Sequence, residues 1–260
     1  MLLHFEWQGR GYSVQTSQAI DLSRAVDFDA EQPQFFGLPR AEQRSIEVPG
    51  FVGDTRRGGP CNCRTLSLSP HANGTHTESM QHIDAAAPGP AQAISQGLMV
   101  ARLITLQPTS LAQSREHYND CGEPQDEILS AAALKAALSD ELLPQAVVLR
   151  SLPNTSDKLC QDYDTNWAPY LSFEAIDWLC QAGVLHLILD LPSIDRHDDG
   201  GELPNHHRFW QAMGASASIT ELAFVPQTAL DGLYLLDLQL PNLLTDAVPS
   251  RPLIYPVTEA

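Results

Sequence analysis

Positive charge is scarce in this chain. Only 15 of its 260 residues are Lys or Arg, against 32 Asp and Glu, which leaves a formal net charge of −17 at pH 7. No run of basic residues forms a stripe that would neutralise phosphates. We therefore expect no nucleic-acid partner. An acidic field of this size favours cations near the protein, although acidity more often serves only solubility.

Long apolar runs are missing as well. A helix that crosses a bilayer needs about 20 predominantly apolar residues. The longest candidate, residues 185–191, is interrupted by His186 and Asp190. The first twelve residues contain Glu6 and Arg10 and lack the basic start and apolar run of a secretion signal. The sequence therefore predicts a cytoplasmic protein with no membrane partner.

Cysteine is sparse, and its five residues are an odd number, so a disulfide framework is a poor explanation for them. Cys61 and Cys63 form the one close pair, which is a weak zinc signal without a second such pair. The remaining composition, 43% hydrophobic and 18% charged, is that of a globular protein with a sizeable core. We expect one domain over residues 1–260.

Alternating apolar patterns and turn residues predict an α/β fold. Aromatic and β-branched residues around a glycine turn indicate a hairpin over 4–14. Residues 27–59 are rich in Pro, Gly and charge and are expected to form a long loop, of a kind that often covers an active site. Further strands are expected at 63–69, 100–106, 146–150, 185–191, 218–224 and 233–240, and helices at 126–139 and 172–182. The order of strand 146–150, helix and strand 185–191 predicts a β-α-β unit.

The first group of chemically active residues follows the strand expected at 63–69. His76 and Glu78 are two apart, so on an extended backbone they share a face. His71 joins them only if Asn73-Gly74 bends or bulges. Nitrogen and carboxylate ligands suit Zn, Mn or Fe rather than Ca or Mg.

Exposed loop histidines are the ordinary alternative for this group. Three of the nine histidines nevertheless fall within twelve residues, with a carboxylate among them, which favours a metal site in a hydrolytic centre. The third, His82, follows Glu78 by four residues. It is either a ligand or a general base, because imidazole titrates near neutral pH.

A second group of polar residues lies far along the chain. Asp195 follows an expected strand end and either contacts substrate, supports another site residue or caps a turn. His206 and His207 begin an expected short helix. Glu221 lies in an apolar strand, and a buried carboxylate there needs a partner, which is either a metal or a salt bridge.

These residues resemble the metal-dependent cyclase family, which includes bacterial kynurenine formamidase and isatin hydrolase. Members carry His-x-Gly-Thr-His-x-Asp-x-x-x-His after a strand, and much later a His and a Glu about a dozen residues apart. Gly74-Thr75-His76 and His82 match the first pattern. Residues 190–195 resemble the family's Asp-x-x-Ser-x-Asp strand end, and residues 21–23 its opening.

The resemblance implies a swivelling β/β/α fold with a mixed central sheet, often in a homo-oligomer. It also implies one or two Zn or Mn ions that open amide, imide or lactone bonds. On this basis the expected metal ligands are His71, His76, Glu78, His206 and Glu221, with His82 as the general acid/base and Asp195 at the substrate. His206 fits the pattern better than His207.

Two departures from the family pattern bear on these expectations. His71 precedes His76 by five residues instead of four, and Glu78 replaces an aspartate, which lengthens that side chain by one methylene. The sequence therefore predicts a small-molecule hydrolase that is not expected to be a kynurenine formamidase. Two alternatives remain open: a non-catalytic metal- or ligand-binding protein, and a metal-dependent lyase or dehydratase.

Overall fold

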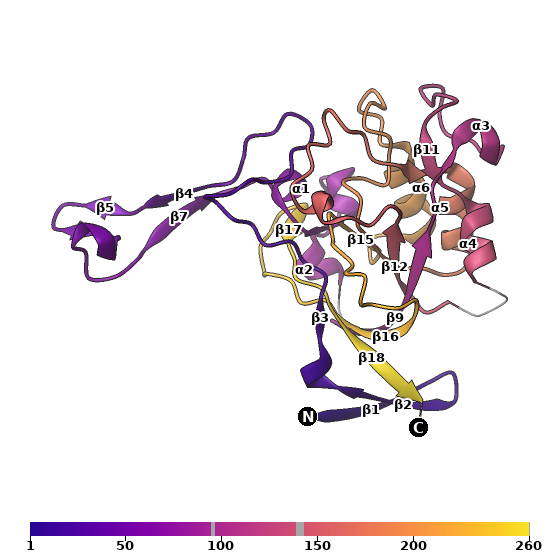
Figure 1. Ribbon diagram of the computed structural model, residues 1–260, viewed down its shortest axis with the longest axis horizontal. Coiled ribbons are helices and arrows are strands. Elements are labelled where there is room, and N and C mark those ends of the chain that lie inside the picture. The colour runs from indigo at the N-terminus through magenta and orange to yellow at the C-terminus, as the bar shows by residue number, and fades with distance from the viewer. Residues whose placement is uncertain (95–96, 139–142, 260) are drawn as a thin grey trace.

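The computed structural model describes residues 1–94, 97–138 and 143–259. Its centre is a mixed sheet of eleven strands (Figure 1). In chain order these are β1 Leu2–Trp7, β2 Arg10–Gln15, β3 Ile20–Asp21, β8 His76–Ser79, β9 Leu98–Leu106, β12 Ala146–Ser151, β14 His186–Leu189, β15 Ser218–Glu221, β16 Gly232–Asp237, β17 Ala247–Pro249 and β18 Leu253–Glu259. Their order in space is β1-β2-β18-β16-β9-β12-β14-β15-β8-β17, and β3 pairs with β18.

The middle of the sheet is parallel and buried on both faces. Strands β9, β12, β14 and β15 run parallel, whereas β16, β8 and β17 are antiparallel to their neighbours. All six residues of β12 are buried. Its Val147 and Leu149 belong to one apolar core, and its Ala146 and Val148 to a second core on the opposite face. This alternation follows from the pleat of the strand.

Helices cover one of these two faces. The helical segments are α1 Pro70–Asn73, α2 Pro90–Ala93, α3 Leu111–Ser114, α4 Ala131–Ala137, α5 Phe173–Gln181 and α6 Pro204–Met213, with 3-10 turns η1 Thr16–Gln18, η2 Thr55–Arg57, η3 Met80–His82 and η4 Ser156–Leu159. Apolar residues of α4, α5 and α6 pack against the first core. Within the described residues, no helix is long and apolar enough to span a membrane.

The helix expected at 172–182 is confirmed as α5, because Ser172 caps it by accepting a hydrogen bond from the Ala175 N–H. The helix expected at 126–139 is wrong at its start. Residues Glu127–Leu129 instead form β11, which pairs with β10 Thr109–Ser110 and β13 Tyr170–Leu171. Ser130 then caps the shorter helix α4. The expected end of the helix, Ser139, lies outside the described residues.

The N-terminal hairpin is confirmed as β1 and β2, and β2 joins the large sheet by pairing with β18. The long loop expected at 27–59 is wrong in its second half. There the chain forms β4 Glu42–Ser45, β5 Glu47–Val48 and β6 Phe51–Val52. The strand expected at 63–69 exists as β7 Arg64–Ser67, but it pairs with β4 outside the central sheet. Together these strands make an arm that projects from the body (Figure 1).

The large mixed sheet and the N-terminal hairpin confirm the expected α/β class. The strands expected at 100–106, 146–150, 185–191, 218–224 and 233–240 are all present, with ends shifted by a few residues. β15 ends at Glu221 because Leu222 adopts a left-handed conformation, with φ of 53°. That bend places Glu221 at the last position of its strand.

Candidate metal centre

Strand β8 carries the centre of the candidate site. It lies between β15 and β17, and His76 is the register partner of Glu221. His76 and Glu78 are both fully buried. They point to the same side of the strand, since ligand atoms of both lie within 4.8 Å of each other and of a ring nitrogen of His71.

His71 reaches the same place by a helical turn. The expected bulge at Asn73-Gly74 is replaced by the single turn α1, after which Gly74 is extended and leads into β8. Nδ1 of His71 lies 3.3 Å from Oε2 of Glu78, and its ring centroid is 5.1 Å from that of His76. The extra residue between His71 and His76 is therefore taken up by the turn.

His82 lies at the end of the 3-10 turn η3, directly after β8. Its ring stacks on His71 at 4.3 Å between centroids. Its Nε2 lies 3.9 Å from Oε2 of Glu78. The nitrogens of His71, His76 and His206 lie closer, each within 3.5 Å of a carboxylate oxygen of Glu78 or Glu221. About a quarter of the His82 side chain is exposed, so it lies at the rim of the cluster.

The distant half of the site comes from helix α6 and the end of β15. His206 is buried on α6, and its Nε2 lies 2.9 Å from Oε1 of Glu78 and 3.5 Å from Oε1 of Glu221. Oε2 of Glu221 lies 3.5 Å from Nε2 of His76. The neighbouring His207 is exposed and instead lines a different hollow. Of the two candidate histidines, His206 is the one that the fold brings to the site.

Asp195 lies behind His206. Its carboxylate accepts hydrogen bonds from Nδ1 and the backbone N–H of His206, from the Asn205 N–H and from the Tyr118 hydroxyl, at 2.7 to 3.1 Å. Only 3% of Asp195 is exposed. With its oxygens occupied in this way, the geometry favours orientation of His206 over the direct substrate contact expected from the sequence.

Asp246 is a site residue that sequence reasoning missed. It precedes β17, and its Oδ2 lies 2.8 Å from Nε2 of His71 and 3.2 Å from Nδ1 of His82. No spacing pattern links it to these histidines, which are more than 160 positions away in the sequence. Only the pairing of β17 with β8 brings it here.

The charges in the cluster compensate one another. Burial by itself would raise the pKa of Glu78, but His206, His71 and His82 lower that pKa well below its usual range. Burial would lower the pKa of His71, but Glu78 and Asp246 raise it to about 9. His206 likewise has its pKa raised by Glu78, Asp195 and Glu221 despite its burial. The carboxylates therefore favour the positively charged forms of His71 and His206.

Two buried atoms test whether this cluster suits a metal. Nδ1 of His76 lies 3.0 Å from the Gly74 carbonyl, which fixes its proton on that nitrogen and leaves Nε2 as an acceptor. This Nε2 and Oε2 of Glu78 are buried with no hydrogen-bond partner among the described residues. A buried polar atom without a hydrogen bond destabilises the folded state unless a bound ion coordinates it.

Three overlapping groups of side chains bring ligand atoms within 4.8 Å of one another. They are His71, His76 and Glu78; Glu78, His206 and Glu221; and His71, His82 and Asp246. Imidazole nitrogen and carboxylate oxygen form the donor set that suits Zn, Mn or Fe. The residues present therefore fit a divalent metal ion.

A cavity of about 190 Å³ opens onto this cluster. Its other walls are mostly apolar and come from Phe35, Phe36, Leu38, Pro192 and Leu203, with Ser193 as the one further polar residue of the lining. A cavity of this kind suits a small molecule with an apolar part and a polar group that faces the histidines.

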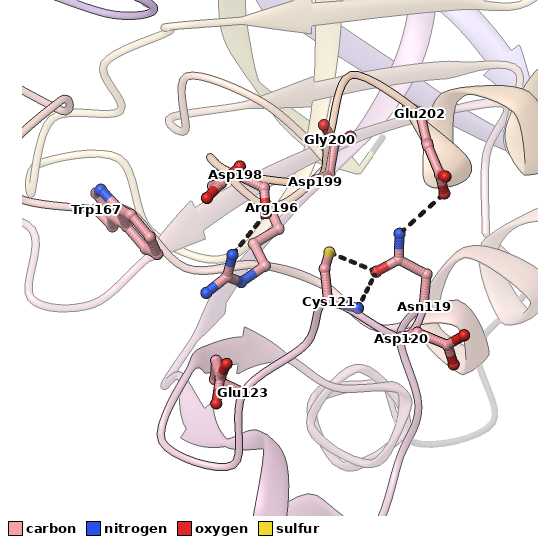
Figure 2. Close-up of a pocket in the computed structure, with 10 residues that line it drawn as sticks. All are labelled: Asn119, Asp120, Cys121, Glu123, Trp167, Arg196, Asp198, Asp199, Gly200 and Glu202. Atoms are coloured by element: carbon pink, nitrogen blue, oxygen red, sulfur yellow. Dashed lines mark hydrogen bonds between the residues drawn. The ribbon is translucent and has the colours of Figure 1, made fainter.

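A larger hollow, of about 860 Å³, lies elsewhere on the body (Figure 2). Its lining includes five acidic residues, Asp120, Glu123, Asp198, Asp199 and Glu202. Arg196 reaches into it, lies 4.7 Å from the Trp167 ring and pairs with Asp126 at 2.7 Å. None of the clustered histidines lines this larger hollow, whereas His71, His82 and His206 line the smaller cavity.

The comparisons with known proteins agree with this geometry. Residues 20–196 match the Cyclase family model, described as "Putative cyclase". No protein of curated function matches the chain significantly in sequence.

Solved structures share the fold at low identity. A predicted metal-dependent hydrolase from Bacillus stearothermophilus is 17% identical with a TM-score of 0.60, over 91% of this chain and 97% of that one. Isatin hydrolase A from Labrenzia aggregata is 17% identical with a TM-score of 0.61, over 91% and 93%. Isatin hydrolase A from Ralstonia solanacearum is 15% identical with a TM-score of 0.62, over 93% and 92%. Because the family match covers more than half of the sequence, the chain belongs to the cyclase family.

Proposed function

We propose that this protein is a metal-dependent hydrolase that opens an amide, cyclic imide or lactone bond of a small molecule. The observation that carries the proposal is the pair of buried atoms that make no hydrogen bond among the described residues, Nε2 of His76 and Oε2 of Glu78, beside a cavity of about 190 Å³. Similarity in fold to proteins named as isatin hydrolases and metal-dependent hydrolases supports it.

The ligands in this proposal are His71, His76, Glu78, His206 and Glu221, which hold one or two Zn or Mn ions. When bound there, a divalent ion would polarise a carbonyl and lower the pKa of a bound water toward about 7. Asp195 fixes Nδ1 of His206, so that Nε2 of that ring faces Glu78 and Glu221.

His82 is the proton carrier of the proposal. Asp246 accepts a hydrogen bond from its Nδ1, which directs Nε2 toward the cluster. A partly exposed imidazole in this position takes a proton from the attacking water and returns it to the leaving group. The apolar walls at Phe35, Phe36 and Leu38 hold the substrate's apolar part next to it.

The test combines metal analysis with an assay panel of formamides, cyclic imides and lactones. His76→Ala is expected to lose both bound metal and hydrolysis. His4→Ala, on an exposed histidine of the N-terminal hairpin, is the matched control and retains both. A His76→Ala protein that keeps its metal content and activity would rule the proposal out.

Two further measurements separate the proposal from its alternatives. His82→Ala is expected to keep its metal but lose turnover, whereas a non-catalytic binding protein gives no turnover with any member of the panel even as the wild type. Hydrolysis in ¹⁸O-labelled water places one labelled oxygen in the product. A lyase or dehydratase forms product without that label, which would contradict hydrolysis.

A further inference from the structure

Two residues that line the cavity at the metal centre hold an unusual backbone conformation. Among the described residues, those that have a positive φ and are not glycine are Gln8, Phe36, Arg115, Leu203 and Leu222. Phe36 and Leu203 both line the cavity of about 190 Å³, and Leu222 directly follows Glu221. The left-handed region is unfavourable for a residue with a Cβ atom, and such residues cluster at functional sites. Their concentration here indicates that the site needs these side chains in fixed positions.

Phe36 occupies a turn position where another kind of residue is usual. The Leu38 N–H donates to the Phe35 carbonyl at 3.2 Å. Between them, Phe36 and Gly37 have φ of 57° and 60°, the pattern of a type I′ turn, in which Asn, Asp or Gly is usual at the first position. The Phe36 ring stacks on His197, with 5.7 Å between centroids and 14° between planes. Phenylalanine at this position therefore serves the cavity wall and not the turn.

The turn is fastened to a neighbouring loop on both sides of Phe36. After it, the Gly37 N–H donates to the Asp164 carboxylate at 2.9 Å. Before it, the Gln34 carbonyl accepts from the Tyr163 N–H at 2.9 Å. These contacts hold the part of the wall that Phe36 provides in one place.

Leu203 reaches the cavity from the start of helix α6. Its φ and ψ are 47° and 49°, although it precedes Pro204, and a residue before proline favours an extended backbone. Its N–H donates to the Asp199 carboxylate at 2.8 Å, and its carbonyl accepts from the His207 N–H at 3.0 Å. Leu203 is therefore fixed relative to His206, which lies three residues later on the same helix.

The cavity is small, and no lysine or arginine of the described chain belongs to its lining. Its volume of about 190 Å³ is below the roughly 300–1,000 Å³ of pockets that hold drug-sized ligands. Its two carboxylates, Glu78 and Glu221, belong to the metal cluster. A carboxylate on the substrate would meet apolar walls and lose its water without gaining a cationic partner. The lining therefore favours a compact group without charge.

We infer that Phe36 and Leu203 are specificity-determining residues, and that they select a substrate with a compact, uncharged apolar group beside the carbonyl that is attacked. This inference rests on the proposed hydrolase function and narrows its substrate class. Glycine would suit both backbone conformations better, but it would remove that part of the wall. Substrates with a wide apolar group or a carboxylate at this place are excluded.

The test measures how the zinc-loaded protein binds a series of hydroxamic acids, which join a metal-binding group to an acyl group of graded width. The series runs from acetohydroxamic and isobutyrohydroxamic to cyclohexane- and adamantane-carbohydroxamic acid, and titration calorimetry measures their binding without turnover. The wild type is expected to bind the adamantane compound at least tenfold more weakly than the isobutyro compound. Succinic monohydroxamic acid, which ends in a carboxylate, is expected to bind at least tenfold more weakly than butanohydroxamic acid. One methylene in an apolar pocket already discriminates by roughly 10- to 200-fold.

Variants at the two positions show which side chains set the limit. Phe36→Gly and Leu203→Gly are each expected to raise the affinity for the adamantane compound relative to the isobutyro compound at least tenfold. This ratio is measured within one protein, so a loss of folded protein does not change it. Leu203→Met keeps the bulk and should keep the wild-type ratio. Gln8→Gly, at φ of 51° in the β1–β2 hairpin and outside the lining, is the matched control and should also keep it.

Three results would overturn the inference. They are a wild type that binds the widest hydroxamic acid as tightly as the isobutyro compound, a carboxylate that does not weaken binding, and glycine variants that keep the wild-type ratio. Failure of the proposed function looks different. A wild type that shows the expected binding pattern but hydrolyses no member of the assay panel would contradict the hydrolase function alone, whereas a protein that takes up no zinc would contradict both.

Discussion

Thr75 links the two halves of the candidate metal centre. It directly precedes His76, and its hydroxyl donates to the carbonyl of Leu222, the residue after Glu221, at 2.7 Å. The same hydroxyl accepts from the Arg24 N–H at 2.9 Å. It therefore holds the left-handed Leu222 turn in the register that aims Glu221 at the site.

The variant Thr75→Val is expected to lower metal affinity by roughly 10- to 100-fold, the usual effect of losing a group that supports metal ligands. Valine keeps the volume but leaves a buried N–H and a buried carbonyl without this partner. Thr75→Ser keeps the hydroxyl and is expected to stay near wild-type affinity. Competition with a chromogenic chelator measures both, and equal affinities for the valine and serine variants would contradict this role.

His186 is a histidine away from the site that should make stability depend on pH. Burial lowers its pKa to about 4, so the folded protein holds it neutral while the unfolded chain takes up a proton below about 6.5. The unfolding free energy should therefore fall as pH drops from 6.5 to 4, by about 1–3 kcal/mol.

Urea unfolding of the wild type and His186→Gln over this pH range checks the effect. The difference between the two proteins is expected to shrink or reverse toward pH 4, because the glutamine carries no such proton linkage. His4→Gln, on an exposed histidine, controls for the loss of an imidazole. Parallel pH curves for the wild type and His186→Gln would show that burial of His186 has no such effect.

At this scale the sequence predicted the local part of the site. The i, i+2 spacing of His76 and Glu78 fixed their common face once β8 was extended. The predicted contact of His71 with the site is present because one helical turn takes up the extra residue between His71 and His76. Asp246 could not be predicted from the sequence, since only strand pairing between β17 and β8 brings it to His71 and His82.

At the scale of elements, helix α5 begins at a cap that also joins a second helix. The Ser172 hydroxyl accepts from the Ala175 N–H at 3.0 Å and donates to the Glu116 carboxylate. That carboxylate also accepts from the N–H groups of Ala131 and Ala132 at the start of α4. One buried serine therefore supports the beginning of two helices.

Ser172→Ala is expected to lower the unfolding free energy by about 1–2 kcal/mol, at the upper end of helix-cap losses because Glu116 loses a partner too. Ser172→Thr retains the hydroxyl and is expected to cost less. Chemical denaturation measures the change in unfolding free energy. The metal content of both variants should equal that of the wild type. An alanine variant as stable as the wild type would mean that the cap contributes nothing.

Helices and strands were predictable where apolar residues recur and polar or turn residues mark the ends of the element. The strands around 146–150 and 185–191 are buried apolar runs bounded by polar or turn residues, and both are present as β12 and β14. The helix expected at 126–139 failed at its start, because Ile128 and Leu129 are needed in the small sheet and Ser130 is the better cap. Within the arm, β7 was predicted as the strand at 63–69, whereas the polar sequence of β4 left no apolar alternation to detect.

At the scale of the whole molecule, the fold brings together segments that the sequence keeps far apart. β8 is inserted between β15 and β17, which lie about 140 and 170 residues later in the chain. An antiparallel strand placed beside the parallel centre follows from no local pattern. The family resemblance implied only a mixed central sheet without a strand order, and the fold confirms that α/β class.

Metal removal should affect the stability of the whole protein. A ligand that binds the folded state at 100 to 1,000 times its dissociation constant stabilises it by about 3–4 kcal/mol. Chelation is therefore expected to lower the melting temperature by roughly 5–15 °C. In His76→Ala the chelator should have no effect, and an equal shift in that variant would place the stabilising metal elsewhere.

The most direct test of the central claim, that the cluster around His76 and Glu78 holds a metal, is an anomalous difference map. It is recorded at the absorption edge of Zn or Mn from a crystal of the protein purified with that metal. The account predicts a peak about 2.0–2.2 Å from Nε2 of His76 and from the Glu78 carboxylate. A crystal whose metal lies elsewhere, or that shows no peak within this cluster, would contradict it.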